Sequence, residues 1–358
     1  MKKNKLIYAS ILAFSITISG CKKDDPETPA EVTPSVSYSN GVFITNEGPY
    51  GTGTGTISFY SRSSGSVSAN LFGAHNTYPL GNVVQSMEVF NSQGYIVVNN
   101  AGKVEVVDAT SFNSQGAINN LVNPRYFLGI NNSKGYVSQW GSGATGEVKV
   151  IDLATKAVTA TINTGNGAEG MVKSGNNVYV ACSGGYVTDS VVTVINTATD
   201  AVVTNITVGA NPSSIKMDAN GKIWVICGGE WNGTITALLK TGRLVRIDPT
   251  TNTVDFSLPF SSTTSSPSHL VINNTGTTLY YMYNGGVYSQ SATSASLNAT
   301  LVINRSFYGL GIDPTNNYFY GSDPGNFSSN GKVIRYNAAA TVLDSFNVGL
   351  IPGNFCFQ

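Results

Sequence analysis

The chain has 358 residues, and only 11% of them are charged; 20 basic and 20 acidic side chains give a formal net charge of zero. Without a basic excess to neutralise a phosphate backbone, nucleic acid is excluded as an expected partner. The 39 glycines, together with abundant Thr, Ser, Asn, Val and Tyr, favour a β-rich extracellular protein.

Residues 1–20 have the pattern of a secretory signal peptide. Three lysines precede a mostly apolar run from Leu6 to Ile18, which is shorter than the ~20 residues that span a bilayer. The run ends in Ile18-Ser19-Gly20-Cys21, which resembles the bacterial lipobox. This resemblance implies cleavage before Cys21 and acylation of its thiol and new amine, which would anchor the protein to a membrane. An ordinary signal peptide with an incidental cysteine is the alternative.

Residues 21–37 are expected to form a flexible tether. The charged sequence Lys22-Lys23-Asp24-Asp25 resembles the surface-export signal of Bacteroidota lipoproteins, with a solvated charged linker as the alternative. The following segment, "PETPAEVTPSVS", has three prolines and no apolar periodicity. We therefore expect a lipid-anchored protein of the outer membrane, exposed on the cell surface.

Residues 38–358 contain seven copies of a four-strand unit. One strand type alternates apolar and polar residues and then reaches Asp or Asn, as in "KVEVVD", "EVKVID" and "VVTVIN". Its copies lie at Ile57, Val104, Val148, Val192, Leu244, Val287 and Val333, with spacings of 43 to 52 residues. That range is typical of a propeller blade of four strands. The Asp or Asn is expected to bond the backbone of the following turn.

The repeats predict an all-β fold, a seven-bladed β-propeller with four-stranded blades. "GVFITN", from Gly41, supplies a second strand, and "IPGNFCF", from Ile351, supplies a first strand, so N- and C-terminal strands would complete one blade and close the ring. An open β-solenoid would need capping ends. The repeats resemble YVTN-type, YncE-like propellers, and the resemblance covers nearly the whole chain after the tether.

In such a propeller, the loops that lead into the first strands and the loops between second and third strands open on one face. Aromatic and hydrogen-bonding residues gather in these loops and predict a ligand-binding rim. An insertion, "GGEWNGTITALLKTG", should stand on the same rim with Trp231 exposed at its start. For any one aromatic, such as Trp140, packing between blades is the alternative. The predicted rim residues are Tyr50, Tyr78, Arg125, Tyr126, Trp140, Glu169, Tyr186, Trp231, His269, Tyr308 and Phe327.

The sequence does not indicate a catalytic site, a metal site or a cofactor. It has two histidines, His75 and His269, and no nucleophile-elbow spacing; His269 is expected to be a hydrogen-bonding rim residue. After Cys21, the remaining Cys182, Cys227 and Cys356 are odd in number and lie in apolar runs. They are therefore expected to be buried free thiols.

These features favour a surface-tethered, non-enzymatic lipoprotein that captures a ligand for nutrient uptake. The architecture and tether resemble propeller lipoproteins of the BtuG type, and this resemblance implies a corrinoid such as cobalamin as ligand and a TonB-dependent outer-membrane transporter as partner. A protein-docking or surface-layer module is the main alternative. An enzyme such as a lactonase or quinoprotein is a further alternative, which would need a ligand set that the sequence does not display.

Overall fold

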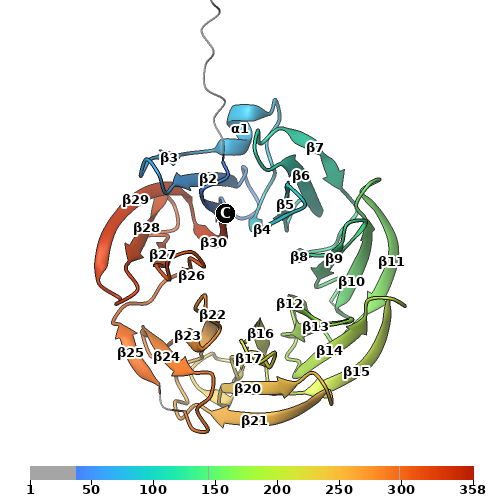
Figure 1. Ribbon diagram of the computed structural model, residues 1–358, viewed down its shortest axis with the longest axis vertical. Helices are drawn as coiled ribbons and strands as arrows, with labels where there is room; N and C mark the ends of the chain where they lie inside the picture. The colour runs from blue at the N-terminus through green and yellow to red at the C-terminus, as the bar shows by residue number, and fades with distance from the viewer. Residues whose placement is uncertain (1–37, 144, 298) are drawn as a thin grey trace, which may run out of the picture. The chain divides into compact units, whose positions relative to one another are not determined.

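The computed structural model describes residues 38–358 apart from 144 and 298. The predicted signal peptide, Cys21 and the tether lie outside the described residues. Seven four-stranded antiparallel sheets stand around a common centre, each with its first strand innermost (Figure 1). The predicted seven-bladed β-propeller is therefore confirmed.

Three of the blades follow one another between residues 84 and 207. Blade 2 comprises β4 (Val84–Phe90), β5 (Gln93–Val98), β6 (Lys103–Asp108) and β7 (Ser114–Ile118). Blade 3 comprises β8 (Pro124–Asn131), β9 (Lys134–Gln139), β10 (Glu147–Asp152) and β11 (Ala157–Asn163). Blade 4 comprises β12 (Ala168–Ser174), β13 (Asn177–Cys182), β14 (Val191–Asn196) and β15 (Ala201–Thr207).

Three further blades follow with the same order of strands. Blade 5 comprises β16 (Pro212–Met217), β17 (Ile223–Cys227), β20 (Arg243–Asp248) and β21 (Thr253–Pro259). Blade 6 comprises β22 (Ser268–Ile272), β23 (Thr278–Tyr283), β24 (Gly286–Ser291) and β25 (Thr300–Ile303). Blade 7 comprises β26 (Gly309–Ile312), β27 (Phe319–Asp323), β28 (Asn330–Tyr336) and β29 (Val342–Leu350).

The closing blade combines both ends of the described chain. Its order is β3 (Val67–Ser68), β2 (Thr56–Ser61), β1 (Gly41–Asn46) and β30 (Pro352–Phe357). Antiparallel pairing places Phe43 opposite Cys356 and Ile44 opposite Phe355. The predicted closure of the ring by N- and C-terminal strands is confirmed, and it removes the open sheet edges that a linear array would leave.

The hydrophobic core lies between neighbouring blades. Each of seven clusters of buried side chains draws on facing sheets; one, for example, joins Tyr179 of β13 with Val225 of β17. The second strands are apolar on both faces because both faces are covered, and β17 is buried along its whole length. The outermost strands are largely exposed, as in β11.

The turns after the third strands contain the predicted Asx bonds. The Oδ1 atom of Asp152 accepts from the Thr155 amide at 2.8 Å, and that of Asn196 accepts from the Ala198 amide at 2.9 Å. The predicted thiols are also present: among the described residues Cys182 and Cys227 are buried and free, and Cys356 is free and partly buried.

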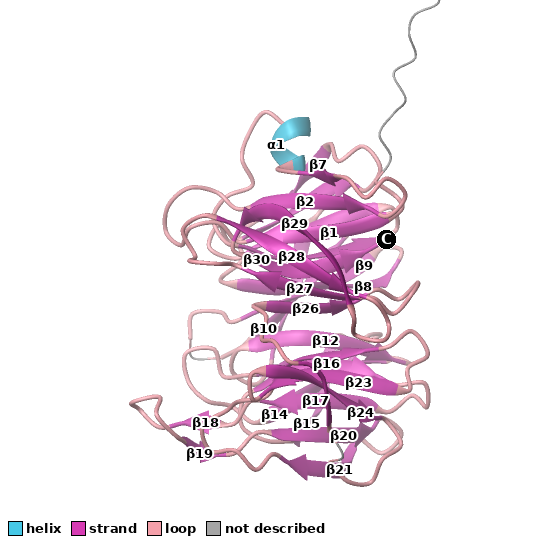
Figure 2. Cartoon of the chain, turned by 90° about the vertical axis from the view of Figure 1, so that its left-hand side faces the viewer, coloured by secondary structure: helices cyan, strands magenta, loops and turns pink. Residues whose placement is uncertain are grey.

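Two irregular elements interrupt the repeat. A five-residue helix, α1 (Leu71–His75), lies between β3 and β4. The predicted insertion in blade 5 forms a hairpin of β18 (Glu230–Trp231) and β19 (Leu238–Lys240), which projects from one side of the ring (Figure 2). No helix within residues 38–358 is long and apolar enough to cross a bilayer.

Candidate ligand-binding site

The expected rim forms because the starts of the innermost strands are bonded to the loops after the second strands. The amide of Trp140 donates to the Asn123 carbonyl, that of Ser183 to Gly167 and that of Gly228 to Asn211, at 2.8 to 3.1 Å. The closing blade has the same contact, between the Glu47 amide and the Ile351 carbonyl. The rim consists of the residues at the starts of the innermost strands and of those in the loops after the second strands.

Seven structurally equivalent residues point from the rim into the centre. Each lies at the start of an innermost strand, and in six of the seven blades the pairing register shifts beside it. Such bulges re-aim a side chain out of the sheet. This ring position is occupied by Gln85, Arg125, Glu169, Ser213, Ser268, Tyr308 and Gly353, and all seven residues line one central cavity of about 840 Å³.

The ring is chemically one-sided. Charged or amide side chains stand on three consecutive blades, as Gln85, Arg125 and Glu169, whereas Ser213 and Ser268 on the next two blades are small and blade 7 contributes the phenol of Tyr308. At Gly353 the space that a Cβ atom would take is instead reached by the Glu47 carboxylate, 3.3 Å away. The charged groups of the ring are therefore concentrated on one wall of the cavity, formed by blades 2 to 4.

Arg125 is the centre of the polar wall. Its Nε donates to both oxygens of Glu169 at 3.1 and 3.2 Å, and its Nη1 donates to Gln85 Oε1 at 2.5 Å. Trp140 Nε1 donates to Glu169 Oε1 at 2.8 Å, and the guanidinium lies 4.5 Å from the centre of the Trp140 ring. Burial opposes the charge of Arg125, but Glu169, Tyr126 and Glu47 together outweigh it and raise the pKa of the guanidinium.

A second carboxylate stands next to this wall. Tyr308 Oη donates to both oxygens of Glu47 at 3.0 and 3.1 Å. Burial raises the pKa of Glu47, while the Tyr308 bond and the charge of Arg125 act in the opposite direction. The wall thus has two carboxylates for one guanidinium, an arrangement that favours ligands rich in hydrogen-bond donors.

Two further ring neighbours are neutral at physiological pH. Burial raises the pKa of Tyr126 to about 12 and lowers the pKa of His269 to about 4. The His269 Nδ1 contacts Ser268 Oγ at 3.1 Å. Both side chains are therefore available for hydrogen bonding without carrying charge.

Bonds between neighbouring innermost strands hold the ring in place, on the polar wall and also between blades 5 and 6. Asn354 Nδ2 donates to the Gln85 carbonyl at 2.8 Å, Ser86 Oγ to the Arg125 carbonyl at 2.7 Å, and Ser214 Oγ to the Leu270 carbonyl at 3.1 Å. Each of these three donors directly follows a ring residue in the chain. The scaffold therefore fixes the polar groups before any ligand arrives.

The structure brings nine of the eleven predicted rim residues to this site. Six line the cavity: Tyr50, Arg125, Tyr126, Glu169, His269 and Tyr308. Three stand beside the cavity. Trp140 is hydrogen-bonded to Glu169, the ring centres of Tyr186 and Trp140 are 5.6 Å apart, and those of Phe327 and Tyr308 are also 5.6 Å apart.

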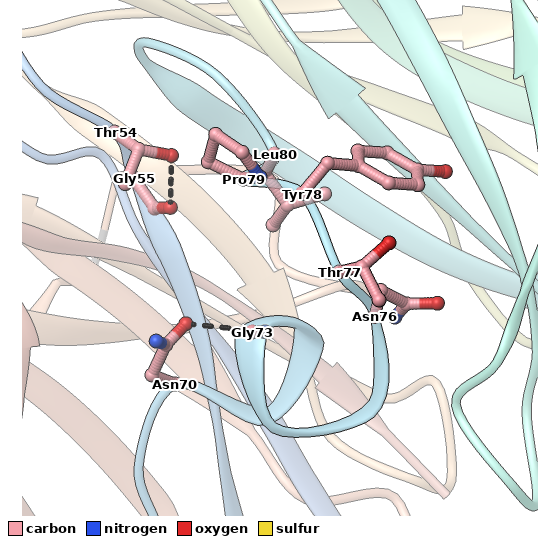
Figure 3. A pocket seen from close by; sticks show the side chains of 9 residues that line it. All are labelled: Thr54, Gly55, Asn70, Gly73, Asn76, Thr77, Tyr78, Pro79 and Leu80. Carbon is pink, nitrogen blue, oxygen red and sulfur yellow. Dashed lines mark hydrogen bonds between the residues drawn. The ribbon is translucent and has the colours of Figure 1, made fainter.

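Tyr78 and Trp231 do not line the central cavity. Tyr78 lines a separate cavity of about 230 Å³ beside α1 (Figure 3). Its hydroxyl donates to Glu105 Oε1 and also contacts Ser114 Oγ, each at 2.7 Å. Trp231 lies in the projecting hairpin and is partly buried rather than exposed, because β18 pairs with β19 and places it opposite Leu238. For Tyr78, the helical insertion before β4 moves the residue away from the centre.

Two charged residues of the cavity were not predicted from the sequence. Glu88 of β4 and Lys216 of β16 line the cavity three positions after the ring residues Gln85 and Ser213. The sequence feature that could have indicated them is a charged residue within a first strand. Among the described residues, no group of three or more His, Cys, Asp or Glu side chains is arranged to hold a metal ion.

Comparisons with known proteins support the fold. Residues 40–344 match the family described as "Domain of unknown function (DUF5074)". No curated protein matches the chain.

Solved structures of differently named proteins share this architecture at low sequence identity. Hydrazine synthase from Kuenenia stuttgartiensis is 18% identical, with a TM-score of 0.62 over 78% of this chain and 92% of that one. A quinonprotein alcohol dehydrogenase-like protein from Bacteroides thetaiotaomicron is 14% identical, with a TM-score of 0.66 over 90% and 79%. A protein described as a putative 6-phosphogluconolactonase from Bacteroides uniformis is 12% identical, with a TM-score of 0.63 over 89% and 99%. At these identities the likeness shows the fold alone.

Proposed function

Since the chain belongs to the DUF5074 family, a domain of unknown function, we propose from its own residues that it is a non-enzymatic binding protein. It holds a ligand rich in hydrogen-bond donors in the central cavity and is tethered to the outer membrane through a lipidated Cys21. Ligand capture at the cell surface would serve nutrient uptake through a TonB-dependent transporter.

The observation that supports this proposal best is the one-sided ring. Gln85, Arg125 and Glu169 are fixed by mutual hydrogen bonds beside a cavity of about 840 Å³, a size within the usual range for ligand sites. Charged groups held in place in this way lose little conformational freedom when a ligand binds. A merely structural ring would be expected to fill its centre with apolar side chains.

The aromatic residues beside the cavity favour a large ligand with flat or apolar parts. Tyr50 is 82% exposed, Tyr186 is 61% exposed and Phe327 is 52% exposed. Such side chains offer wide contact area together with polar tips. A corrinoid, with its broad ring and many amide groups, is the ligand that we propose; its amide donors match the Glu47 and Glu169 carboxylates.

The experiment is a titration of the purified protein with cyanocobalamin and cobinamide, followed by tryptophan fluorescence. Saturable quenching at micromolar concentration is expected, because Trp140 bonds directly to Glu169. The Glu169→Gln variant should weaken binding about tenfold. Tyr78→Phe is the matched control, because Tyr78 lies in the separate cavity. Absence of quenching by either compound would rule out the corrinoid.

The wider proposal of ligand capture has its own test. Native mass spectrometry of the protein, after incubation with a small-molecule extract of bacterial culture medium, should show a bound mass. That mass should be reduced in Glu169→Gln and retained in Tyr78→Phe. If the wild-type protein takes up nothing from such extracts, the capture function is wrong.

A second candidate, protein docking, is favoured by the exposed hairpin. Ile235 is 73% exposed and has a positive φ of 54°, and Leu239 is also largely exposed. Exposed apolar residues on a projecting element are typical of contact surfaces. A photo-crosslinking residue at position 235 in intact cells should yield a discrete adduct with an outer-membrane protein if docking is the function.

A further inference from the structure

A second layer of equivalent positions, here called the deep layer, follows the ring along the innermost strands, and four of its residues, Glu88, Lys216, Val271 and Gly311, line the cavity. Three positions after each ring residue, the innermost strands carry Glu88, Leu128, Val172, Lys216, Val271, Gly311 and Cys356. Five of these positions are apolar or glycine, so only blades 2 and 5 place charges in the layer. These blades stand three steps apart in a ring of seven, which puts β4 and β16 on opposite sides of the centre (Figure 1).

Lys216 lacks a close anionic partner within the described residues. No carboxylate lies within ion-pair distance of its ammonium group, and the charge that acts on it most is Glu88. Burial lowers the pKa of Lys216, because its environment solvates the charged form poorly. An ammonium group in such a place gains by pairing with an anion.

Glu88 is only a partial counterion. One of its oxygens accepts a long hydrogen bond, 3.3 Å, from the Gly129 amide. Burial raises its pKa to about 7, so a large fraction of the carboxyl groups is protonated and neutral near pH 7. Glu88 therefore compensates the Lys216 ammonium group only in part, and no other carboxylate among the described residues forms an ion pair with it.

The surroundings of Lys216 select the kind of anion. Val271, Ile272, Ile312 and Phe357 line the same cavity and offer apolar contact. A single ammonium group suits a monoanion, whereas a dianion would also meet the Glu88 carboxylate. We propose that the deep layer binds the carboxylate of an organic acid, with Lys216 pairing with the carboxylate and the apolar residues covering its hydrocarbon part.

This inference rests on the proposed function in one respect, which is that the cavity admits small molecules. It does not need the polar wall, since Lys216 lies three residues beyond the ring. A ligand that uses both layers would therefore carry hydrogen-bond donors at one end and a carboxylate at the other.

The probe is 2-naphthoate, compared with its uncharged isostere 2-naphthamide in saturation-transfer NMR and calorimetry on the purified protein. The naphthoate should bind at least about tenfold more tightly than the amide. Lys216→Met should abolish this preference. Lys173→Met is the matched control: Lys173 also lies on an innermost strand, but its ammonium group bonds the Ile130 carbonyl and does not line the cavity.

Two outcomes would overturn the proposal: equal affinity for the two compounds, or no binding of the naphthoate at millimolar concentration. A preference retained in Lys216→Met would do the same. The wild-type comparison requires no variant, so it stands even if Lys216→Met folds poorly. Glu169→Gln separates the two proposals, because it should weaken rim ligands and leave the naphthoate preference unchanged.

Discussion

The pair formed by Arg125 and Glu169 gives the sharpest test of how the polar wall is held. Their side chains are 18% and 7% exposed, and their closest contact is 3.1 Å. In Arg125→Met the aliphatic stem is retained, but the Glu169 carboxylate keeps only the Trp140 bond. Breaking a buried pair from one side costs about 3 kcal/mol or more, because the remaining charge is poorly solvated.

The double variant, Arg125→Met with Glu169→Gln, should recover most of this loss. Removing both charges leaves no uncompensated ion, so we expect a coupling free energy of about 2 kcal/mol. For a folded unit of this size, a loss of 3 kcal/mol corresponds to about 4 °C in Tm. Thermal unfolding followed by circular dichroism, with all four proteins at one pH and ionic strength, measures both quantities.

A surface pair provides the reference for this cycle. Arg335 and Asp344 also form an ion pair, but the Asp344 side chain is 46% exposed. Exposed pairs typically contribute less than about 1 kcal/mol, so the cycle of Arg335→Met and Asp344→Asn should give a smaller coupling. If Arg125→Met destabilises the protein no more than the double variant does, the reasoning about the buried carboxylate is refuted.

Four further predictions follow from the same structure. The pKa of Glu88 is raised from 4.5 to about 7, and the titratable groups that interact with it are Lys216 and Cys356. Ionisation of Glu88 therefore does not destabilise the folded state below pH 4.5 and destabilises it by the full free energy of the pKa shift above pH 7. Urea unfolding of Glu88→Gln should therefore show stability relative to wild type that grows by about 3 kcal/mol between these pH values, and a pH-independent difference would contradict the shift. Deletion of residues 352–358 should expose the edge of β1 and produce oligomers in size-exclusion chromatography, whereas a stable monomer would show that β30 is dispensable. Tyr95 stacks on Phe127 with ring centres 3.8 Å apart, so Tyr95→Ala should cost about 4 kcal/mol in thermal unfolding. Its control, Tyr95→Phe, loses only the hydroxyl bond to Gln93 and should cost about 1 kcal/mol. Because burial raises the pKa of the Cys227 thiol, its alkylation by iodoacetamide should proceed only as fast as the protein opens, and rapid labelling of the native protein would disagree with this burial.

The fold was predictable because burial leaves a periodic trace in the sequence. The third strands of neighbouring blades share an alternating pattern at regular spacing, and their number fixed the number of blades. The pairing of Gly41–Asn46 with the C-terminal strand followed from counting strands at each end. Helix α1 could not be predicted in this way, since five residues are too few to display a helical period.

The site was only partly predictable because loop position does not determine radial position. Residues after Pro124 were assigned to the rim from the loop in which they occur, and Arg125 and Tyr126 do line the cavity. Tyr78 occupies a similar place in the repeat, yet the insertion that contains α1 holds it next to Glu105. Lys216 and Glu88 lie within strands, so the composition of the loops does not indicate them.

The way the ring closes also sets a time order for folding. Thr45 and Asn354, which are bonded to each other in the closing blade, lie 309 positions apart in the chain. Bringing such distant segments together costs about 5 kcal/mol in chain entropy, beyond the constant cost of any loop. Synthesis proceeds from the N-terminus, so β1 emerges first and waits for β30, the last blade strand to be made. Until then the closing blade is incomplete, so the ring cannot close before nearly all of the described chain has been made.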